Sequence, residues 1–300
     1  MTMTTTMPSV DVIGEAACAS SRRLMVFGGR ANPSLAAEIG SQLGVGLSPV
    51  QLKTFSAGEV YCRYEESIRG ADVFIVQSIC QNEESGMGTN DALVELLVMI
   101  DAAVGASAHR VIAVTPWFGY SRQDKKSAPR EPISARMVAR ILESAGADRV
   151  LAMDLHAGQI QGMFQVPVDH MTASIALSDH FIGLGLTDEL VVVAPDVGRV
   201  KHGKEFAERI GASLAILDKS RPEQQAAEVD HIIGNVAGKT AIIVDDMIDT
   251  AGTLRAAAIA VAREGANQVF ATATHPVFSG RAYENLAASP LEQIVVTGTS

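Results

Sequence analysis

Cysteine is scarce in this sequence. The 300-residue chain contains three, Cys18, Cys62 and Cys80. They are too few and too irregularly spaced to form a disulfide framework or a zinc site with four protein ligands. The scarcity therefore predicts a protein of the reducing cytoplasm.

Positive charge is also in short supply. The chain has 24 Lys and Arg residues against 34 Asp and Glu residues, which gives a formal net charge of -10. Non-specific binding to nucleic acid requires a basic surface that neutralises phosphates, so this class of partner is excluded. An anionic substrate would have to be bound by a few cations placed next to it.

Long apolar runs are absent. No stretch reaches the roughly 18 consecutive apolar residues that indicate a membrane span. The first residues, MTMTTTMPSVDVIGEAACAS, lack the basic region and the apolar centre of a signal peptide. We therefore predict no membrane partner, and we interpret residues 1–21 as a flexible N-terminal extension.

Hydrophobic residues make up 47% of the chain, enough for a sizeable core, and the length suggests two domains. Short β-branched runs such as DVFIVQS and RVIAVTPWF alternate with helical patterns such as NDALVELLVMIDAAVGA. This alternation predicts an α/β fold with parallel sheets. The pattern starts again after DHMTASIALSDHFIGLG, which places an N-terminal α/β domain at residues 22–170 and a C-terminal one at 171–300. Ligands of such sheets bind beyond the carboxyl ends of the strands.

The segment TAIIVDDMIDTAGTLRAAA, residues 240–258, predicts a phosphate-binding loop between a buried strand and a helix. The backbone N–H groups of residues 249–253 and the Thr250 and Thr253 hydroxyls can hold a phosphate at the helix N-terminus. Asp245 and Asp246 would then accept hydrogen bonds from ribose hydroxyls. The alternative is an ordinary Asp-rich turn that caps the helix.

His156 follows the predicted strand RVLAM, within the string MDLHAGQIQGMFQVPVDH. Its position alone leaves two interpretations open, a packing histidine and a catalytic one. The wider string and the loop at 245–253 resemble the signatures of the phosphoribosyl-diphosphate (PRPP) synthetases, or ribose-phosphate pyrophosphokinases. Further matches occur in the family's order, among them FSAGEV, EESIRG, RQDKK, APDVGRV and LDKSRPE, so the resemblance extends from residue 22 to the end.

The resemblance implies two phosphoribosyltransferase-like domains, an N-terminal one that binds ATP and a C-terminal one that binds ribose 5-phosphate. It also implies transfer of the β,γ-diphosphate of ATP to the anomeric hydroxyl of ribose 5-phosphate, with Mg2+ as cofactor and with PRPP and AMP as products. Charge develops on phosphate oxygens during such a transfer, so cations close to the reacting centre are the main requirement.

Several residue roles follow from the same resemblance. Lys219 and Arg221 match positions that stabilise the transition state, although the string alone would fit a solvated turn. His156 is assigned to catalysis and, with Asp196, to the metal; Asp196 is the better direct ligand, since Mg2+ prefers oxygen. The residues assigned to ribose 5-phosphate are Arg221, Asp245, Asp246, Asp249, Thr250, Ala251, Gly252 and Thr253.

The nucleotide is assigned to the first domain. Phe55 can stack on adenine, Glu59 can accept a hydrogen bond from its amine, and Arg122 can bind phosphate. In the family a neighbouring subunit completes this site, so the resemblance implies a homo-oligomer, usually a hexamer. The complete assignment is Phe55, Ala57, Gly58, Glu59, Arg122 and Gln123.

A regulatory phosphate or ADP site is assigned to Ser67, Arg69, Arg130 and Gln161, with ordinary surface residues as the strong alternative.

The sequence departs from the family at four places. Ala57 replaces a frequent Asn or Asp, and Met163 replaces a common aromatic residue. The segment around 81–91 is longer and richer in glycine, which predicts a disordered or specialised loop. The chain also stops at IVVTGTS, where the family continues, and we expect a weaker sheet edge and an altered regulatory site.

Two other functions compete with a PRPP synthetase. A non-catalytic regulatory paralogue is disfavoured because His156, Asp196, Lys219 and Arg221 are all present. A phosphoribosyltransferase, which shares the loop at 245–253, is disfavoured by the two-domain length and by the string DLHAGQIQG.

Overall fold

The structure is a computed structural model that describes residues 22–82, 86–186, 189–220 and 228–300, with only the backbone described at 219, 220 and 228–230. The predicted extension at 1–21 and Arg221 lie outside these residues. Within the described part of the chain, no helix is long and apolar enough to cross a membrane.

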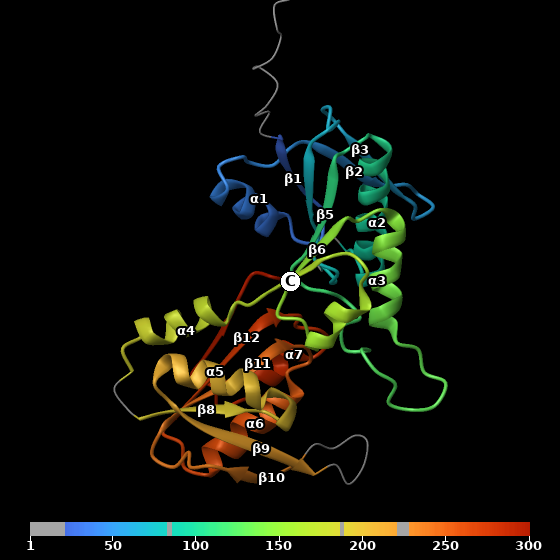
Figure 1. The fold of residues 1–300 in the computed structure, drawn as a ribbon. Coiled ribbons are helices and arrows are strands. Elements are labelled where there is room, and N and C mark those ends of the chain that lie inside the picture. Colours follow the sequence, from blue (N-terminus) through green and yellow to red (C-terminus); the bar gives the residue numbers. More distant parts are fainter. Residues whose placement is uncertain (1–21, 83–85, 187–188, 221–227) are drawn as a thin grey trace, which may run out of the picture.

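The first domain is built on a five-stranded parallel sheet with the order β1-β4-β5-β6-β7 (Figure 1). Helices α2 and α3 pack on one face of the sheet, and α1 packs on the other. The strands are β1 (Leu24–Gly28), β4 (Asp72–Val76), β5 (Arg110–Thr115), β6 (Arg149–Met153) and β7 (Val168–Met171), and the helices are α1 (Pro33–Gln42), α2 (Thr89–Gly105) and α3 (Ser134–Ala145).

An antiparallel hairpin, β2 (Val50–Thr54) and β3 (Val60–Tyr64), forms a separate two-stranded sheet that packs against α2. The segment 55–59, which contains four of the predicted nucleotide residues, is the turn of this hairpin. A short 3-10 helix, η1 (Gly158–Met163), follows β6 and leads to β7.

The second domain contains a six-stranded sheet with the order β10-β9-β8-β11-β12-β13, parallel except for the β9/β10 pair. Helices α6 and α7 cover one face, and α4 and α5 cover the other. The strands are β8 (Leu190–Ala194), β9 (Ser213–Ser220), β10 (Glu228–Ile233), β11 (Thr240–Ile248), β12 (Gln268–Pro276) and β13 (Gln293–Val296), and the helices are α4 (Ser174–Gly183), η2 (Val197–Arg199), α5 (Val200–Ile210), α6 (Gly252–Arg263) and α7 (Ala282–Ala287).

The central strands are apolar along their whole length because helices cover both faces of each sheet. In β8, Val191, Val192 and Val193 are all fully buried, although successive side chains point to opposite faces. The expected fold of two mainly parallel sheets flanked by helices is therefore confirmed. The boundary at residues 170 and 171 stays a prediction; β7 ends at Met171, and α4 packs on the second sheet.

Buried polar contacts join the two domains. The Asp154 carboxylate, at the end of β6, accepts hydrogen bonds from Thr274 Oγ1 at 2.6 Å and from the Ala173 N–H at 2.9 Å. His275 Nε2 lies 3.1 Å from the Met153 carbonyl oxygen, and its ring packs against Trp117 with 4.7 Å between ring centroids. The carboxyl ends of β6 and β12 are thereby held next to each other.

The last residues of the chain lie between the domains (Figure 1). Asn32 Nδ2 donates to the Gly298 carbonyl oxygen at 2.7 Å, and Ser78 Oγ donates to that of Thr299. The Thr299 hydroxyl lies 2.8 Å from His275 Nδ1. This segment therefore contacts the first domain although it follows β13 of the second.

The segment around 81–91 is ordered in its described part. Asn82 and Met87 form an antiparallel bridge, and Asn82 Nδ2 donates to the Ala31 carbonyl oxygen at 2.8 Å. The next residues start α2. For these residues the prediction of a disordered loop is therefore wrong. The other alternative, a specialised loop, stays a prediction.

Candidate active site between the domains

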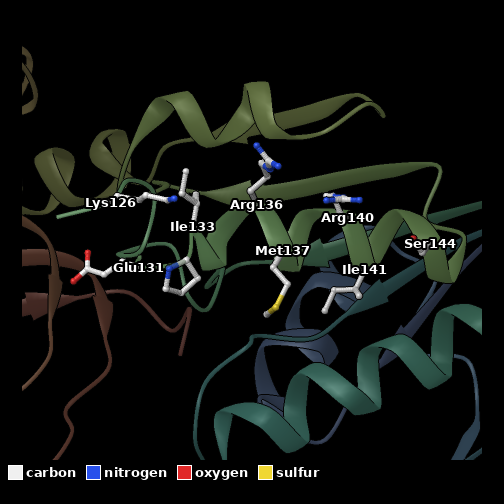
Figure 2. A pocket seen from close by; sticks show the side chains of 9 residues that line it. Lys126, Glu131, Ile133, Arg136, Met137, Arg140, Ile141 and Ser144 are labelled. Carbon is white, nitrogen blue, oxygen red and sulfur yellow. The ribbon is translucent and has the colours of Figure 1, made fainter. Parts of the chain in front are cut away.

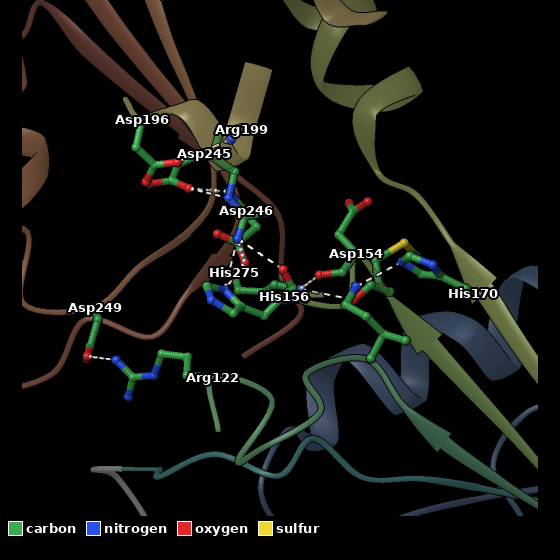
Figure 3. A network of polar contacts seen from close by, with 12 residues as sticks. Arg122, Asp154, His156, His170, Asp196, Arg199, Asp245, Asp246, Asp249 and His275 are labelled. Carbon is green, nitrogen blue, oxygen red and sulfur yellow. Dashed lines mark hydrogen bonds and ion pairs between the residues drawn. The ribbon is translucent and has the colours of Figure 1, made fainter. Parts of the chain in front are cut away.

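A cavity of about 900 Å³ opens where the two domains meet. Its size is typical of sites for small ligands, which occur often at domain interfaces. The turn after β6 lines it from the first domain, and the ends of β8 and β11 and the start of α6 line it from the second (Figure 3). The predicted residues in its wall are Arg122, His156, Asp196, Asp245, Asp246, Asp249, Thr250, Ala251 and Thr253.

His156 contacts the acid pair across the domain boundary. Its Nδ1 atom lies 2.8 Å from Oδ2 of Asp246, a residue 90 positions further along the chain. The Asp246 carboxylate is ionised, so a hydrogen bond at this distance requires the proton on Nδ1. This tautomer leaves the lone pair on Nε2, in a ring that lines the cavity.

Arg199, the last residue of η2, contacts the same two residues and Asp245. Its NH2 group lies 2.8 Å from Asp246 Oδ2, 2.9 Å from His156 Nδ1 and 3.2 Å from the His156 carbonyl oxygen. Because Nδ1 carries a proton, the two hydrogens of this group are donated to the carboxylate and the carbonyl. The Nε atom lies 3.3 Å from Asp245 Oδ1, and 15% of the arginine side chain is exposed.

Burial and charge affect the two acids in opposite ways. Burial by itself would raise the pKa of Asp246, but the hydrogen bond from His156 and the charge of Arg199 lower it to about 2. Burial and the adjacent charge of Asp246 raise the pKa of Asp245 well above its usual value. Arg199, next to both acids, opposes this rise at Asp245 only in part.

Asp196 lies in the loop after β8. Its Oδ1 accepts from the Arg199 N–H at 3.2 Å, so it caps η2, and the residue is exposed at the cavity wall. The described residues contain no group of three or more metal-binding side chains. This arrangement fits Mg2+, which usually binds one or two carboxylates together with substrate phosphates and water.

The predicted phosphate loop is at the N-terminus of α6. Ala251 adopts φ 59°, a left-handed conformation, immediately before the helix starts at Gly252. The first turn of α6 contains no acidic residue, and Thr250, Gly252 and Thr253 are exposed. The free N–H groups of this turn can bind an anion by donating hydrogen bonds to it.

Asp249 of this loop forms an ion pair with Arg122 of the first domain and accepts a hydrogen bond from Ser279 Oγ (Figure 3). Burial works in the opposite direction, but these two partners lower the pKa of the Asp249 carboxyl. The contact brings one residue assigned to ATP and one assigned to ribose 5-phosphate to the same side of the cavity.

The other nucleotide residues lie elsewhere. Phe55, Ala57, Gly58 and Glu59 are exposed at the turn between β2 and β3 and do not line the cavity. The Gln123 side chain accepts a hydrogen bond from Ser134 Oγ, at the start of α3, and lies outside the cavity wall as well. Within one chain the structure therefore brings only Arg122 of this group to the cavity.

Of the two predicted catalytic cations, Lys219 and Arg221, the structure describes only the backbone of Lys219. The backbone of Lys219 lies in β9, where it pairs with Val229 of β10. Its side chain and the whole of Arg221 lie outside the described residues, so their roles stay predictions.

The four regulatory residues are exposed and scattered. Ser67 and Arg69 lie between β3 and β4, Arg130 precedes α3, and Gln161 is in η1, where it contacts His170 Nδ1 at 3.1 Å. Among the described residues, no hydrogen bond or ion pair joins Ser67 or Arg69 to the other two.

A second cavity, of about 580 Å³, lies beside α3 and contains none of the predicted site residues. Arg136 and Arg140 lie on one side of this helix, and Met137 and Ile141 lie on another (Figure 2).

Sequence reasoning missed three groups at the interface: Arg199, the Asp154–Thr274 contact, and His170, whose Nε2 accepts from the Leu155 N–H at 2.9 Å. A signal existed for Arg199, because it lies three residues after Asp196 in the string APDVGRV. The Asp154–Thr274 contact joins residues 120 positions apart, and no local pattern indicates it. His170 is the last residue of the string MDLHAGQIQGMFQVPVDH, but nothing in that string indicates its contact with Leu155.

Comparison with known proteins gives consistent matches. Residues 24–146 match the family model described as the N-terminal domain of ribose phosphate pyrophosphokinase, and residues 229–300 match one described as a phosphoribosyl synthetase-associated domain. The ribose-phosphate pyrophosphokinase of Caldanaerobacter subterraneus subsp. tengcongensis is 50% identical over 276 residues, which cover 92% of this chain and 85% of that protein.

The protein of the same name from Chlorobaculum tepidum is 48% identical over 277 residues, 91% of this chain and 83% of that protein. The crystal structure of phosphoribosylpyrophosphate synthetase from Mycobacterium smegmatis superposes with a TM-score of 0.85 at 40% identity. It covers 93% of this chain and 89% of that one.

Proposed function

The chain belongs to the ribose-phosphate pyrophosphokinase family, and on that basis we propose that it transfers the β,γ-diphosphate of ATP to the anomeric hydroxyl of ribose 5-phosphate. The products are PRPP and AMP. The anomeric oxygen forms a bond to the β-phosphorus, and the bond between that phosphorus and the oxygen retained by AMP breaks. The hydroxyl loses its proton in the process.

One observation of the structure carries this proposal. His156 of the first domain and the anion-binding start of α6 in the second domain face the same cavity. A transfer between two phosphorylated substrates requires both to be held in one water-poor space with their reacting atoms aligned. An interdomain cavity with one binding element from each side meets this requirement.

The second domain is proposed to bind the sugar phosphate. The N–H groups at the start of α6 and the Thr250 and Thr253 hydroxyls hold the 5-phosphate. Asp245 and Asp249 accept from ribose hydroxyls, and Asp246 orients His156 through its contact with Nδ1. Asp246 thus does not bind the sugar itself but acts through His156.

The first domain is proposed to bind ATP. Arg122 donates to the phosphates, which requires it to exchange its contact with Asp249 for one with the nucleotide. Lys219 and Arg221 stabilise the charge that develops at the transferring group. The hairpin turn with Phe55 and Glu59 lies away from the cavity, which supports its use in the site of a neighbouring subunit of a homo-oligomer, with a hexamer as the proposed assembly.

Mg2+ is the proposed cofactor, and its chemistry is to neutralise the phosphate oxygens of the nucleotide. Asp196, exposed at the cavity wall, is the residue placed to hold it directly. His156 presents the lone pair of Nε2 and can accept a hydrogen bond from a water molecule in the cavity. The cytoplasm is the proposed location.

The test is an assay of purified protein with ATP, ribose 5-phosphate and Mg2+, in which AMP and PRPP are measured together. Equal amounts of the two are expected. A regulatory paralogue would produce neither at saturating substrates and phosphate, and a phosphoribosyltransferase would consume PRPP without forming AMP from ATP.

The same assay with the variant Lys219→Ala tests the proposed role of this residue. Because the proposed role is transition-state stabilisation, we expect turnover to fall by at least about a hundredfold while KM for ATP changes little. A raised KM with turnover preserved would make Lys219 a simple binding contact.

A further inference from the structure

We propose that Arg199 is a built-in cation of this site, which takes the place of a metal ion at the Asp245–Asp246 pair and holds His156 in position. Its contacts carry the proposal. One guanidinium lies 2.8 Å from Asp246 Oδ2, 3.3 Å from Asp245 Oδ1 and 3.2 Å from the His156 carbonyl oxygen. Only the part of the proposal that concerns turnover rests on the proposed function.

The charges at this point require a cation. Asp246 is 4% exposed, and Asp245 is adjacent to it with 24% of its side chain exposed. Two carboxylates held this close in a partly dry cavity repel each other and attract either a divalent ion or a basic side chain. A guanidinium remains charged at all physiological pH values, so Arg199 supplies the pair with one permanent positive charge.

The guanidinium contacts one oxygen of each acid. Its planar fork donates through Nε to one acid and through NH2 to the other, while NH2 also reaches the His156 carbonyl oxygen. In agreement, no group of three metal-binding side chains exists among the described residues. We infer that a divalent ion enters this site with the nucleotide and is not bound by the acid pair beforehand.

The same contacts position His156. The NH2 group donates to the histidine's own carbonyl oxygen, and the carboxylate that Arg199 holds fixes Nδ1. Arg199 itself projects from η2, whose cap is Asp196. Four side chains from three elements are therefore linked through one arginine, which makes Arg199 a positioning residue.

The first test measures Mn2+ binding by calorimetry on the full chain without ATP or ribose 5-phosphate, so it does not depend on the proposed reaction. Arg199→Ala is expected to bind one Mn2+ more than the natural chain, or to bind it at least about tenfold more tightly. The double variant Arg199→Ala, Asp245→Asn should lose this gain. Arg122→Ala is the matched control, since Arg122 pairs with an aspartate at the rim and is 53% exposed; its Mn2+ binding should stay unchanged.

A second measurement applies even where Arg199→Ala does not fold. Asp245→Asn in the natural background should leave Mn2+ binding unchanged, because Arg199 already occupies the pair. Loss of Mn2+ binding in Asp245→Asn would overturn the proposal, as would unchanged binding in a folded Arg199→Ala protein.

Arg199→Lys separates charge from position. Lysine keeps the positive charge but lacks the planar fork, so Mn2+ binding should remain that of the natural chain. Turnover should fall at least about tenfold with little change in either KM, because His156 loses its support. Turnover equal to that of the natural chain would contradict the positioning role.

Discussion

Asp246 has a double function at the scale of single residues. The same oxygen, Oδ2, accepts from His156 at 2.8 Å and from Arg199 at 2.8 Å. Its charge is the reason that both partners can be partly buried at a cavity otherwise rich in acids. Removing the charge would leave the partly buried guanidinium with Asp245, at 3.3 Å, as its only carboxylate partner among the described residues.

Asp246→Asn is therefore expected to destabilise the protein by about 3 kcal/mol, the cost of breaking a buried ion pair. Thermal and urea unfolding without substrates would measure the loss. Asp196→Asn is the matched control, because Asp196 is exposed and its amide analogue can still cap η2, so a change within about 0.5 kcal/mol is expected. Equal losses in the two variants would show that the Asp246 charge is not specifically required.

At the scale of residues, only part of the site could be predicted from the sequence. The string around Asp245 and Asp246 predicted both acids at the end of a strand, but β11 continues past them to Ile248. The string DLHAG predicted His156 just after another strand. That the two ends touch depends on how the domains dock, over a separation of 90 residues. Arg199 could have been suspected from its place three residues after Asp196, together with the question of which cation balances the acids.

At the scale of elements, the central strands could be predicted, whereas β2, β3 and β7 could not. β4, β5, β8 and β11 are covered on both faces and appear in the sequence as continuous apolar runs. β2 and β3 form a two-stranded sheet that is half exposed, and their segments VQLKT and VYCRY mix polar and apolar residues. β7 has only four residues. Such segments lack the pattern from which strands are recognised.

The β2–β3 turn is held by its own backbone. The Phe55 N–H donates to the Glu59 carbonyl at 2.8 Å, and the Gly58 N–H donates to the Phe55 carbonyl at 2.8 Å. Gly58 has φ 90°, a conformation that side chains rarely adopt. The Phe55 ring packs on Tyr61, with 5.8 Å between centroids, and on the Lys53 ammonium at 5.1 Å. The exposed ring is therefore held in one orientation by its neighbours.

Gly58→Ala is expected to distort this turn. No atom lies within 4 Å of the added Cβ, so the cost, about 1–2 kcal/mol, comes from the backbone conformation alone. We expect KM for ATP to rise while turnover at saturation is kept, as measured by steady-state kinetics. Gly105→Ala, at the end of α2 with equally open surroundings and no positive φ, is the control and should behave as the natural chain. An unchanged KM in Gly58→Ala would exclude this turn from nucleotide binding.

At the scale of the whole molecule, His275 connects the domains. Its Nε2 lies 3.1 Å from the Met153 carbonyl oxygen, and its Nδ1 lies 2.8 Å from the Thr299 hydroxyl oxygen. Burial is the main reason that the pKa of His275 is lowered below its usual value. The folded protein thus binds this proton less readily than the unfolded chain does.

Stability should therefore fall in acid. Between pH 7.5 and the ordinary histidine pKa of about 6.5 the contribution of His275 is constant, and it is lost as the pH falls from there towards the lowered value in the folded state. The loss is at most about 1.4 kcal/mol per pH unit. Unfolding curves at pH 7.5 and 5.5 should show a smaller decrease for His275→Gln than for the natural chain. His231→Gln, at an exposed position of β10, should keep the natural pH dependence; the same dependence in His275→Gln would contradict the assignment.

The contact of His275 with Trp117 has an optical consequence. Trp117 is the only tryptophan of the chain, it is 5% exposed, and it lies at the joint between the two domains. Its emission therefore reports on this joint and on nothing else in the chain. The intrinsic fluorescence of Trp117 can therefore be used to follow interdomain opening during turnover, without an attached dye.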